Sequence, residues 1–165
     1  MIFEHLIQEN REPFTERVKE ICTYLGIDPD WLMLVMWFET AGTLDHRIVN
    51  KTSGATGLIQ FMPATARSLG TTTGQLRQMS NVEQLDYVKC YLTPYRWRMN
   101  NWLDVYCAVF WPAAIGKPDD YVIKSDKVTR QNPALDINKD LDIHKWEIRQ
   151  ALLNSVPKQY KHLFE

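Results

Sequence analysis

One acidic residue stands out because its spacing places it on the apolar face of a helix. Leu32, Val35 and Met36 precede Glu39 by seven, four and three positions, so all four share one face of the helix expected there. An apolar environment disfavours the charged carboxylate, and so does the negative end of the helix dipole. Both effects raise the pKa of Glu39 towards the range in which a carboxyl group acts as a general acid near neutral pH.

Glu39 also has an ordinary interpretation. Many helices carry one glutamate near an apolar face, where it reaches solvent or forms an ion pair. Arg47 and Lys51 follow in the next segment, and either could be its partner. Spacing alone does not decide between this interpretation and a catalytic acid.

The segment that follows contains a glycine motif. It reads Ser53-Gly-Ala-Thr-Gly57-Leu-Ile-Gln60-Phe-Met-Pro-Ala-Thr-Ala66. Glycine at positions 54 and 57 allows the backbone to approach a ligand closely or to adopt positive φ angles. Gln60 offers both a donor and an acceptor to a sugar hydroxyl or N-acetyl group. Turn formation by the glycines and a surface amide that caps a helix are the alternatives.

Glu39 and this motif together resemble the core of the soluble lytic transglycosylases, which are related to goose-type lysozymes. In that family a helix-terminal glutamate is followed, after a loop, by Gly-Ala-x-Gly-Leu-Met/Ile-Gln-x-Met-Pro-x-Thr-Ala. The resemblance spans about residues 26–118. It implies a lysozyme-like, mainly α fold and cleavage of the β-1,4 bond between N-acetylmuramic acid and N-acetylglucosamine in peptidoglycan. Glu39 would then be the catalytic acid and subsequently the base.

The resemblance also implies which residues contact the glycan. The predicted substrate-binding residues in this part of the chain are Thr40, Ser53, Gly54, Gly57 and Gln60. Family members commonly have serine directly after the catalytic glutamate, and threonine at position 40 keeps the hydroxyl. Met62 is expected in the core instead.

A later family motif, Ala-Tyr-Asn-Ala-Gly, supplies a tyrosine near the catalytic glutamate, and this chain departs from it. The corresponding helix end reads Tyr106-Cys-Ala-Val-Phe110-Trp111-Pro. Tyr106, Phe110, Trp111, or Tyr91 and Tyr95 from the preceding helix end, are the candidates for that place. Trp111 is the first choice for stacking on a sugar, with Tyr95 as a further predicted contact; core packing accounts equally well for Phe110.

Two reactions share the first protonation step. A lytic transglycosylase lets the sugar's own 6-hydroxyl attack, which gives a 1,6-anhydro product and requires one carboxylate. A lysozyme-type hydrolase adds water, usually with help from a second carboxylate. Asp45 is the only nearby candidate for that second group, and a turn-forming aspartate is its alternative role. A single carboxylate fits better, which favours transglycosylase chemistry without a required cofactor.

A second motif lies near the C-terminus. Its oxygen-bearing side chains have the spacing of an EF-hand or dockerin-type calcium loop: Asp136, Asn138, Asp140, Asp142 and Glu147. Leu141 stands where such loops normally have glycine for a sharp turn. The alternative is an acidic turn that caps the last helix without metal. Any calcium here would be structural.

Apolar spacing and capping signals predict a single, mostly helical domain over residues 1–165. Helices are expected at 13–25, 29–40, 81–92, 101–110 and 144–153, with a short one at 63–70. Residues 43–58 should form an irregular or short β excursion, and residues 117–135 a polar, broken segment. The three cysteines are expected to be buried free thiols, as suits a reducing compartment.

Composition excludes several classes of function. The 165 residues carry 19 basic and 20 acidic side chains, a net charge of -1, which argues against a nucleic-acid partner. The segment Tyr95-Arg96-Trp97-Arg98 mixes basic and aromatic side chains. Such a mixture is typical of a solvated junction between helices or of the rim of a groove that binds saccharides. No apolar run approaches the ~20 residues of a membrane span.

The N-terminus lacks a secretory signal. We therefore expect synthesis in the cytoplasm and delivery to the cell wall or periplasm by a phage holin, a phage tail or a secretion apparatus. Two rival functions remain: a structural module of a phage tail or secretion spike that binds glycan without cutting it, and a chitin-directed hydrolase.

Overall fold

Helices make up 57% of the chain in the computed structural model, which describes residues 1–165. The prediction of a mainly α protein is therefore confirmed. The elements in chain order are α1 (Arg11–Leu25), α2 (Pro29–Glu39), α3 (Pro63–Ser68), α4 (Thr73–Gln78), α5 (Asn81–Leu92), α6 (Trp102–Phe110), β1 (Val122–Ile123), α7 (Asp126–Gln131), β2 (Ile143–His144) and α8 (Lys145–Ser155), with short 3-10 turns between them.

The helix ends follow the signals in the sequence. Gly26 ends α1 with a φ of 74°, a conformation that glycine adopts without a steric penalty. Asp28 caps α2 by accepting a hydrogen bond from the backbone N–H of Asp30. Ser80 and Glu83 form both halves of the capping box that starts α5. These caps fix where α2 and α5 begin, and both helices contribute to the site described below.

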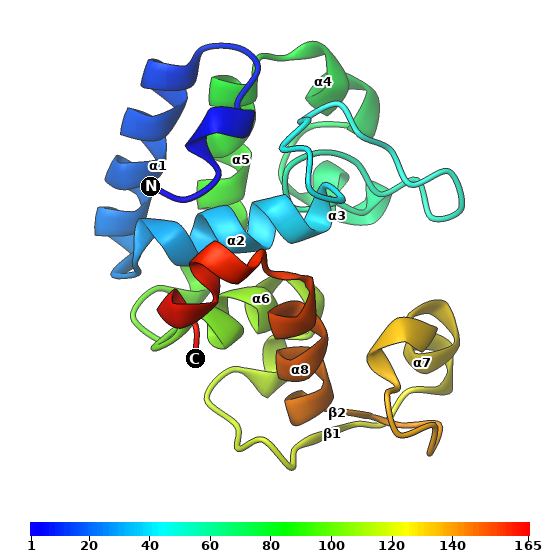
Figure 1. Cartoon of the computed structure of the whole chain (residues 1–165). Helices are drawn as coiled ribbons and strands as arrows, with labels where there is room; N and C mark the ends of the chain where they lie inside the picture. The colour runs from blue at the N-terminus through cyan, green and yellow to red at the C-terminus, as the bar shows by residue number, and fades with distance from the viewer.

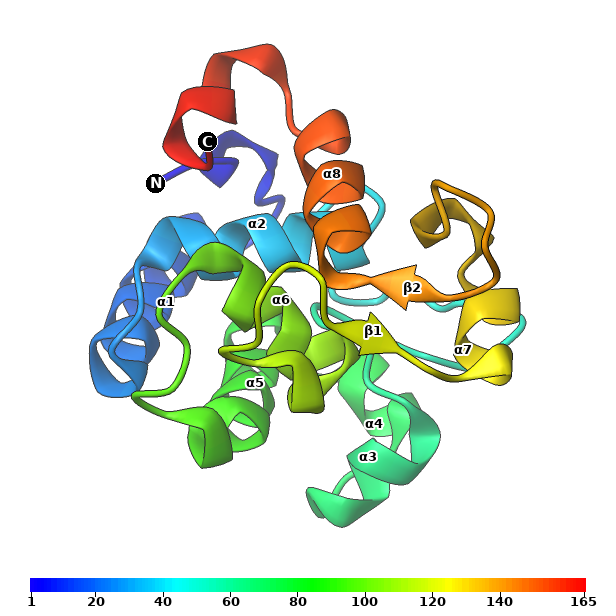
Figure 2. The same ribbon diagram turned by 90° about the horizontal axis from the view of Figure 1, so that it is seen from below.

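Helix α2 runs through the middle of the molecule (Figures 1 and 2). It packs against α1 and α6, and α1 packs in turn against α5. The five residues from Leu32 to Met36 are all fully buried. Near its end, Trp37 stacks on Phe3 from the N-terminal segment with ring centroids 4.6 Å apart, and Phe3 also contacts Tyr160 from the C-terminal segment. Protein therefore surrounds most of α2.

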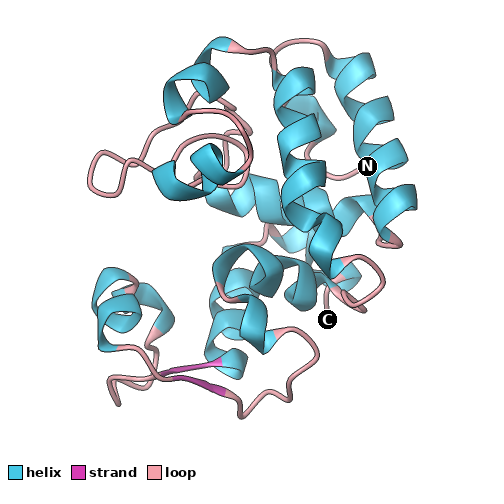
Figure 3. Ribbon diagram, turned by 180° about the vertical axis from the view of Figure 1, so that it is seen from behind, coloured by secondary structure: helices cyan, strands magenta, loops and turns pink.

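Two parts of the chain are irregular or extended. Residues 40–62 form turns with isolated bridges between Val49 and Thr56 and between Thr56 and Phe61, which confirms the predicted irregular excursion. Farther along, β1 and β2 pair antiparallel, with Val122 opposite His144 (Figure 3). Helices α4 and α7, six residues each, were not expected from the sequence.

A buried ion pair fastens the C-terminal segment to the helical core. The ammonium of Lys145 lies 3.1 Å from Oδ1 of Asp104 and also donates to the carbonyl of Lys117. Asp104 accepts further hydrogen bonds from the backbone N–H groups of Gly116 and Asn100. Both side chains are almost completely buried. Helix α8 is thereby held against α6.

The cysteine prediction is correct for two residues and wrong for the third. Cys22 and Cys107 are buried free thiols, whereas Cys90 is exposed. Cys90 lies on α5, whose buried face is formed by Gln84, Leu85, Val88 and Leu92, and it points away from that face. Apolar neighbours in the sequence therefore did not indicate burial.

None of the helices has the length and apolar character needed to cross a membrane.

Candidate active site around Glu39

Glu39 is the last residue of α2, directly after the buried stretch of that helix. Burial among apolar groups raises the pKa of Glu39 to about 8, although the side chain remains partly accessible. Its carboxyl group makes no hydrogen bond within the chain and no ion pair. The expected alternative partner Arg47 instead pairs with Glu9 at 2.9 Å, and Lys51 is exposed without an ion pair. Glu39 is thus a protonated, unpaired acid at neutral pH.

Two tyrosines approach Glu39 from neighbouring helices. Burial raises the pKa of Tyr91 to about 12, with further contributions from Tyr95 and from the charge of Glu39. Burial also raises the pKa of Tyr106 well above its usual value, and the charge of Glu39 adds to the effect. Both phenols therefore stay neutral beside the carboxyl group. The charge of Glu39 contributes to the raised pKa of both Tyr91 and Tyr106.

The two tyrosines are held differently. The hydroxyl of Tyr91 donates to the carbonyl of Ala108 at 2.9 Å, which anchors it to α6. The ring of Tyr106 packs between Phe38, edge-on at 5.5 Å, and Phe110, stacked at 5.7 Å. Its hydroxyl makes no hydrogen bond in the chain and is not among the fully enclosed polar atoms. Only 3% of Tyr106 is exposed, so both tyrosines are fixed parts of the protein beside Glu39, and the role of either as the tyrosine of the family motif stays a prediction.

The glycine motif is tied to α5 by one buried amide that sequence reasoning missed. Gln84 accepts a hydrogen bond from the N–H of Leu58 at 2.7 Å and donates to the carbonyls of His46 and Leu76 at 2.9 Å. A Cβ on Gly57 would lie 2.3 Å from the Gln84 oxygen, so only glycine fits there. The sequence did contain a signal for this role of Gln84. Gln84 precedes Val88 by one helical turn on an apolar helix face, which is the same pattern that drew attention to Glu39.

The other motif residues use their polar groups locally. Gln60 adopts a φ of 52°, and its amide nitrogen donates to the carbonyl of Gly57 at 3.1 Å. Ser53 accepts from the N–H of Ala55, and Gly54 has a φ of 74°. All three are partly exposed. Their contact with a glycan stays a prediction, as does that of Gly57, which is buried.

Two predictions about this region do not agree with the structure. Thr40 is fully buried, and its hydroxyl donates to the carbonyl of Met36 and accepts from the N–H of Leu44. It fixes the end of α2, and its predicted contact with substrate is not supported. Met62, expected in the core, is 47% exposed. Phe61 takes the inward position in this extended segment, so its neighbour points outward.

The remaining candidates lie at the edges of the region. Tyr95 is half-buried and packs against Tyr91 with ring centroids 6.3 Å apart. Trp111 follows α6 and is half-buried, with its indole N–H enclosed and unpaired. Asp45 accepts a hydrogen bond from the backbone N–H of Arg47 at 2.9 Å, which is the turn-forming role. Sugar stacking by Tyr95 and Trp111 and a catalytic role for Asp45 stay predictions.

Three of the proposed calcium ligands lie close together, since Asp136 and Asn138 both accept from the N–H of Asp140 and the amide of Asn138 donates to the Asp140 carboxylate. Glu147 is fully buried, and its carboxylate accepts hydrogen bonds from the backbone N–H groups of Ile137, Asn138 and His144. Asp136 accepts from the N–H groups of Asp140 and Leu141, and Asp140 accepts from the N–H of Asp142. No three acidic or histidine side chains are arranged to hold a metal ion. The residues as arranged form a hydrogen-bonded turn before α8, and binding of calcium to this turn stays a prediction.

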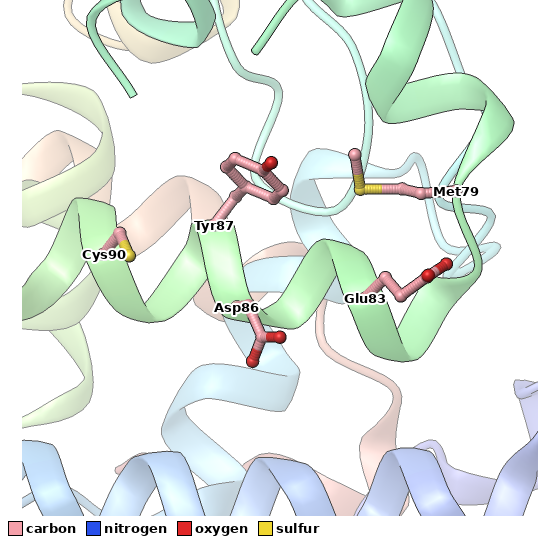
Figure 4. Close-up of a pocket in the computed structure, with 5 residues that line it drawn as sticks. All are labelled: Met79, Glu83, Asp86, Tyr87 and Cys90. Carbon is pink, nitrogen blue, oxygen red and sulfur yellow. The ribbon is translucent and has the colours of Figure 1, made fainter. Parts of the chain in front are cut away.

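A pocket of about 440 Å³ lies along the outer side of α5 (Figure 4). Met79, Glu83, Asp86, Tyr87 and Cys90 line it, and Glu39 does not. Both acids in the pocket are engaged, since Glu83 caps the helix through Ser80 and Asp86 pairs with Arg17. The pocket therefore adds no free acid to the candidate site.

Comparison with known proteins gives no match to any protein-family model, and searches of curated proteins and of solved structures give none either. A proposal for function must therefore be supported by the chemistry of Glu39 and its neighbours and by the motif at residues 53–66.

Proposed function

We propose that this protein is a peptidoglycan-cleaving muramidase with a lysozyme-like fold, acting as a lytic transglycosylase on the bond between N-acetylmuramic acid and N-acetylglucosamine. The observation that carries the proposal is Glu39. It is a carboxyl group with a pKa of about 8, without a hydrogen bond or ion pair, at the end of a buried helix and partly open to solvent. A group in this state can donate a proton at neutral pH.

The chemistry follows from one carboxyl group. Glu39 donates its proton to the glycosidic oxygen, the bond to C1 of N-acetylmuramic acid breaks, and positive charge develops on that ring. The resulting carboxylate then accepts the proton of the 6-hydroxyl as this oxygen bonds to C1. The products are an N-acetylglucosamine end and a 1,6-anhydro ring, and Glu39 is protonated again. The raised pKa favours this return to the acid form.

The surroundings of Glu39 support this route over hydrolysis. Hydrolysis by the common two-carboxylate mechanism needs a second acid across the sugar ring. Asp45, the sequence candidate, is used in a turn through the N–H of Arg47. Tyr106 contributes a neutral phenol near Glu39. The glycine motif, held by Gln84, would support the glycan strand alongside.

Clearing of peptidoglycan tests the catalytic assignment. Wild-type protein should reduce the turbidity of a suspension of purified sacculi, and Glu39→Gln, which keeps the size of the side chain and removes the proton donor, should not. Equal clearing by both proteins would exclude Glu39 as the catalytic acid. Binding to sacculi without clearing by the wild type would support the glycan-binding structural module instead.

The products distinguish the two chemistries. Mass spectrometry of the released muropeptides should show 1,6-anhydro ends, which are lighter by one water than the reducing ends left by a hydrolase. Reducing ends alone would replace the transglycosylase proposal with a hydrolytic lysozyme. Faster digestion of chitin than of sacculi would favour the chitin-directed alternative.

A further inference from the structure

Trp97 is the one aromatic residue that is largely exposed. It lies between α5 and α6 with 64% of its surface open to solvent. Its φ of 64° is a left-handed conformation that bulky residues rarely adopt. Its backbone N–H is bonded to the carbonyl of Leu25 at 3.2 Å. The chain therefore holds a large apolar ring at the surface in a backbone conformation that costs stability.

The ring is fixed by the glycine that ends α1. A Cβ on Gly26 would lie 2.2 Å from the six-membered ring of Trp97, so the indole occupies space that any other residue at position 26 would need. Glycine at position 26 therefore serves two purposes: it adopts the positive φ that ends α1, and it leaves space for the indole ring of Trp97. The ring is packed against backbone on one side and open to solvent on the rest of its surface.

Three cations surround this ring and the neighbouring tyrosines. The guanidinium of Arg96 lies 4.8 Å from the ring centre of Trp97 and 4.1 Å from that of Tyr24. The ammonium of Lys89 lies 4.4 Å from the ring centre of Tyr24. These contacts are of the cation–π type, which positions a charge without neutralising it.

Arg98 completes the group, since its guanidinium lies 6.0 Å from the ring centre of Tyr95. Each ion pair in the structure involves other basic groups, so Lys89, Arg96 and Arg98 have no acidic partner. We call this surface the Trp97 platform; it consists of Tyr24, Lys89, Tyr95, Arg96, Trp97 and Arg98. The platform combines one open aromatic ring, which Arg96 contacts, with two further unpaired cations, Lys89 over Tyr24 and Arg98 over Tyr95.

We propose that the Trp97 platform is a second binding site, for a glycan strand that carries carboxylates, an inference that rests on the proposed function. A flat aromatic face stacks on the apolar face of a sugar ring, and unpaired cations attract the carboxylates of the lactyl and peptide groups on peptidoglycan. Chitin carries no carboxylates, so it would interact with the aromatic ring by stacking but not with the cations.

The platform lies apart from Glu39 along α2. Trp97 contacts the residues just before α2, and Glu39 is the last of its eleven residues. At the helical rise per residue, this helix is about 16 Å long. Figure 1 shows the segment after α5 beside the start of α2, and α3 beside its end. Tyr95 stands between the two sites, since it belongs to the platform and packs against Tyr91. A strand held on the platform would leave the cleavage site free.

Binding without turnover tests the platform. The probe is insoluble sacculi free of teichoic acid, and the reference protein is Glu39→Gln, quantified by co-sedimentation. Adding Trp97→Asn, which removes the ring but tolerates positive φ, should weaken binding about tenfold, as for other central tryptophans of interfaces. Trp97→Phe should retain most of the binding. Leu163→Ala, an exposed apolar residue elsewhere, is the matched control and should bind as the reference does.

A charge variant tests the second half of the proposal. Lys89→Gln with Arg98→Gln should weaken binding to sacculi several-fold and make it less sensitive to salt. Arg96 is left in place because it also donates to the carbonyl of Tyr24. A melting curve for each variant confirms that it is folded before binding is compared.

Each contrary result has a definite meaning. Equal sedimentation of the reference with and without Trp97→Asn would overturn the platform, as would a reference that does not sediment with sacculi. Equal binding to chitin, or tighter binding to duplex DNA, would overturn the carboxylate-bearing glycan as the ligand. Clearing of the same sacculi by the wild type is scored separately, so the muramidase proposal can stand even where the platform fails.

Discussion

Replacing Glu39 with glutamine should stabilise the protein above pH 4.5, by an amount that grows with pH until about pH 8. In the folded state Glu39 keeps its proton up to a pKa of about 8, whereas the ordinary value is 4.5. Between these two values the folded protein binds one proton more than the unfolded chain. The contribution of Glu39 to the free energy of unfolding is therefore fully present below pH 4.5 and is lost as the pH rises towards 8. Glutamine has no proton to lose and escapes this penalty.

The size of the effect follows from the pKa. The pKa of Glu39 is about 8 in the folded protein, roughly 3.5 above its ordinary value of 4.5. Each pKa unit corresponds to about 1.4 kcal/mol, so ionisation of Glu39 can lower the free energy of unfolding by at most about 5 kcal/mol at pH 9. The side chain is partly accessible, so water relieves some of the cost of ionisation. We therefore expect Glu39→Gln to be about 2–3 kcal/mol more stable than the wild type at pH 9, with no comparable gain at pH 4.5.

Urea unfolding of both proteins at pH 4.5, 7 and 9 measures this difference. Subtracting the wild type from the variant at each pH removes the contribution of every other titrating group. Glu12→Gln, which changes an exposed glutamate without an ion pair, is the control and should show no rising gain. A difference that is the same at all three pH values would show that Glu39 titrates normally, and the argument for a protonated acid would fail.

Four other outcomes follow from the same contacts. Gln84→Leu leaves three backbone groups unpaired inside the protein and should cost about 3 kcal/mol or more in urea unfolding, whereas the exposed Gln78→Leu should cost little. Lys145→Met leaves the buried carboxylate of Asp104 without its ion partner and should cost about 3–5 kcal/mol in urea unfolding, and a negligible cost would contradict the buried ion pair. The rate at which sacculi clear should fall above pH 8 as Glu39 loses its proton, and a flat rate to pH 10 would contradict the acid role. Because Glu147 is already engaged by backbone N–H groups, a chelator should leave the melting temperature unchanged, and a lower midpoint would support the calcium site.

The sequence predicted the elements whose signals are local. Caps at Asp28 and Ser80, the glycine after α1 and the apolar spacing of α2 placed the long helices within a few residues of their bounds. The raised pKa of Glu39 followed from the same spacing, because residues three, four and seven apart share a helix face. Local order of this kind does not depend on the rest of the chain.

What the sequence did not predict depends on contacts between distant segments. Helices α4 and α7 are six residues long and mostly polar, too short for an amphipathic period to identify. The exposure of Cys90 and Met62 depends on which face of an element meets the core. The burial of Thr40 came from its bonds to Met36 and Leu44, which no spacing rule indicates.

The ion pair between Asp104 and Lys145 has a mechanical consequence. Asp104 and Tyr106 lie two residues apart on α6, one holding the C-terminal segment and the other beside Glu39. A displacement of α8 is therefore passed to the helix that carries the phenol, through this ion pair and through the indole N–H of Trp102, which donates to the carbonyl of Phe164. A partner that displaced residues 145–165 would act on the geometry of the acid without touching it.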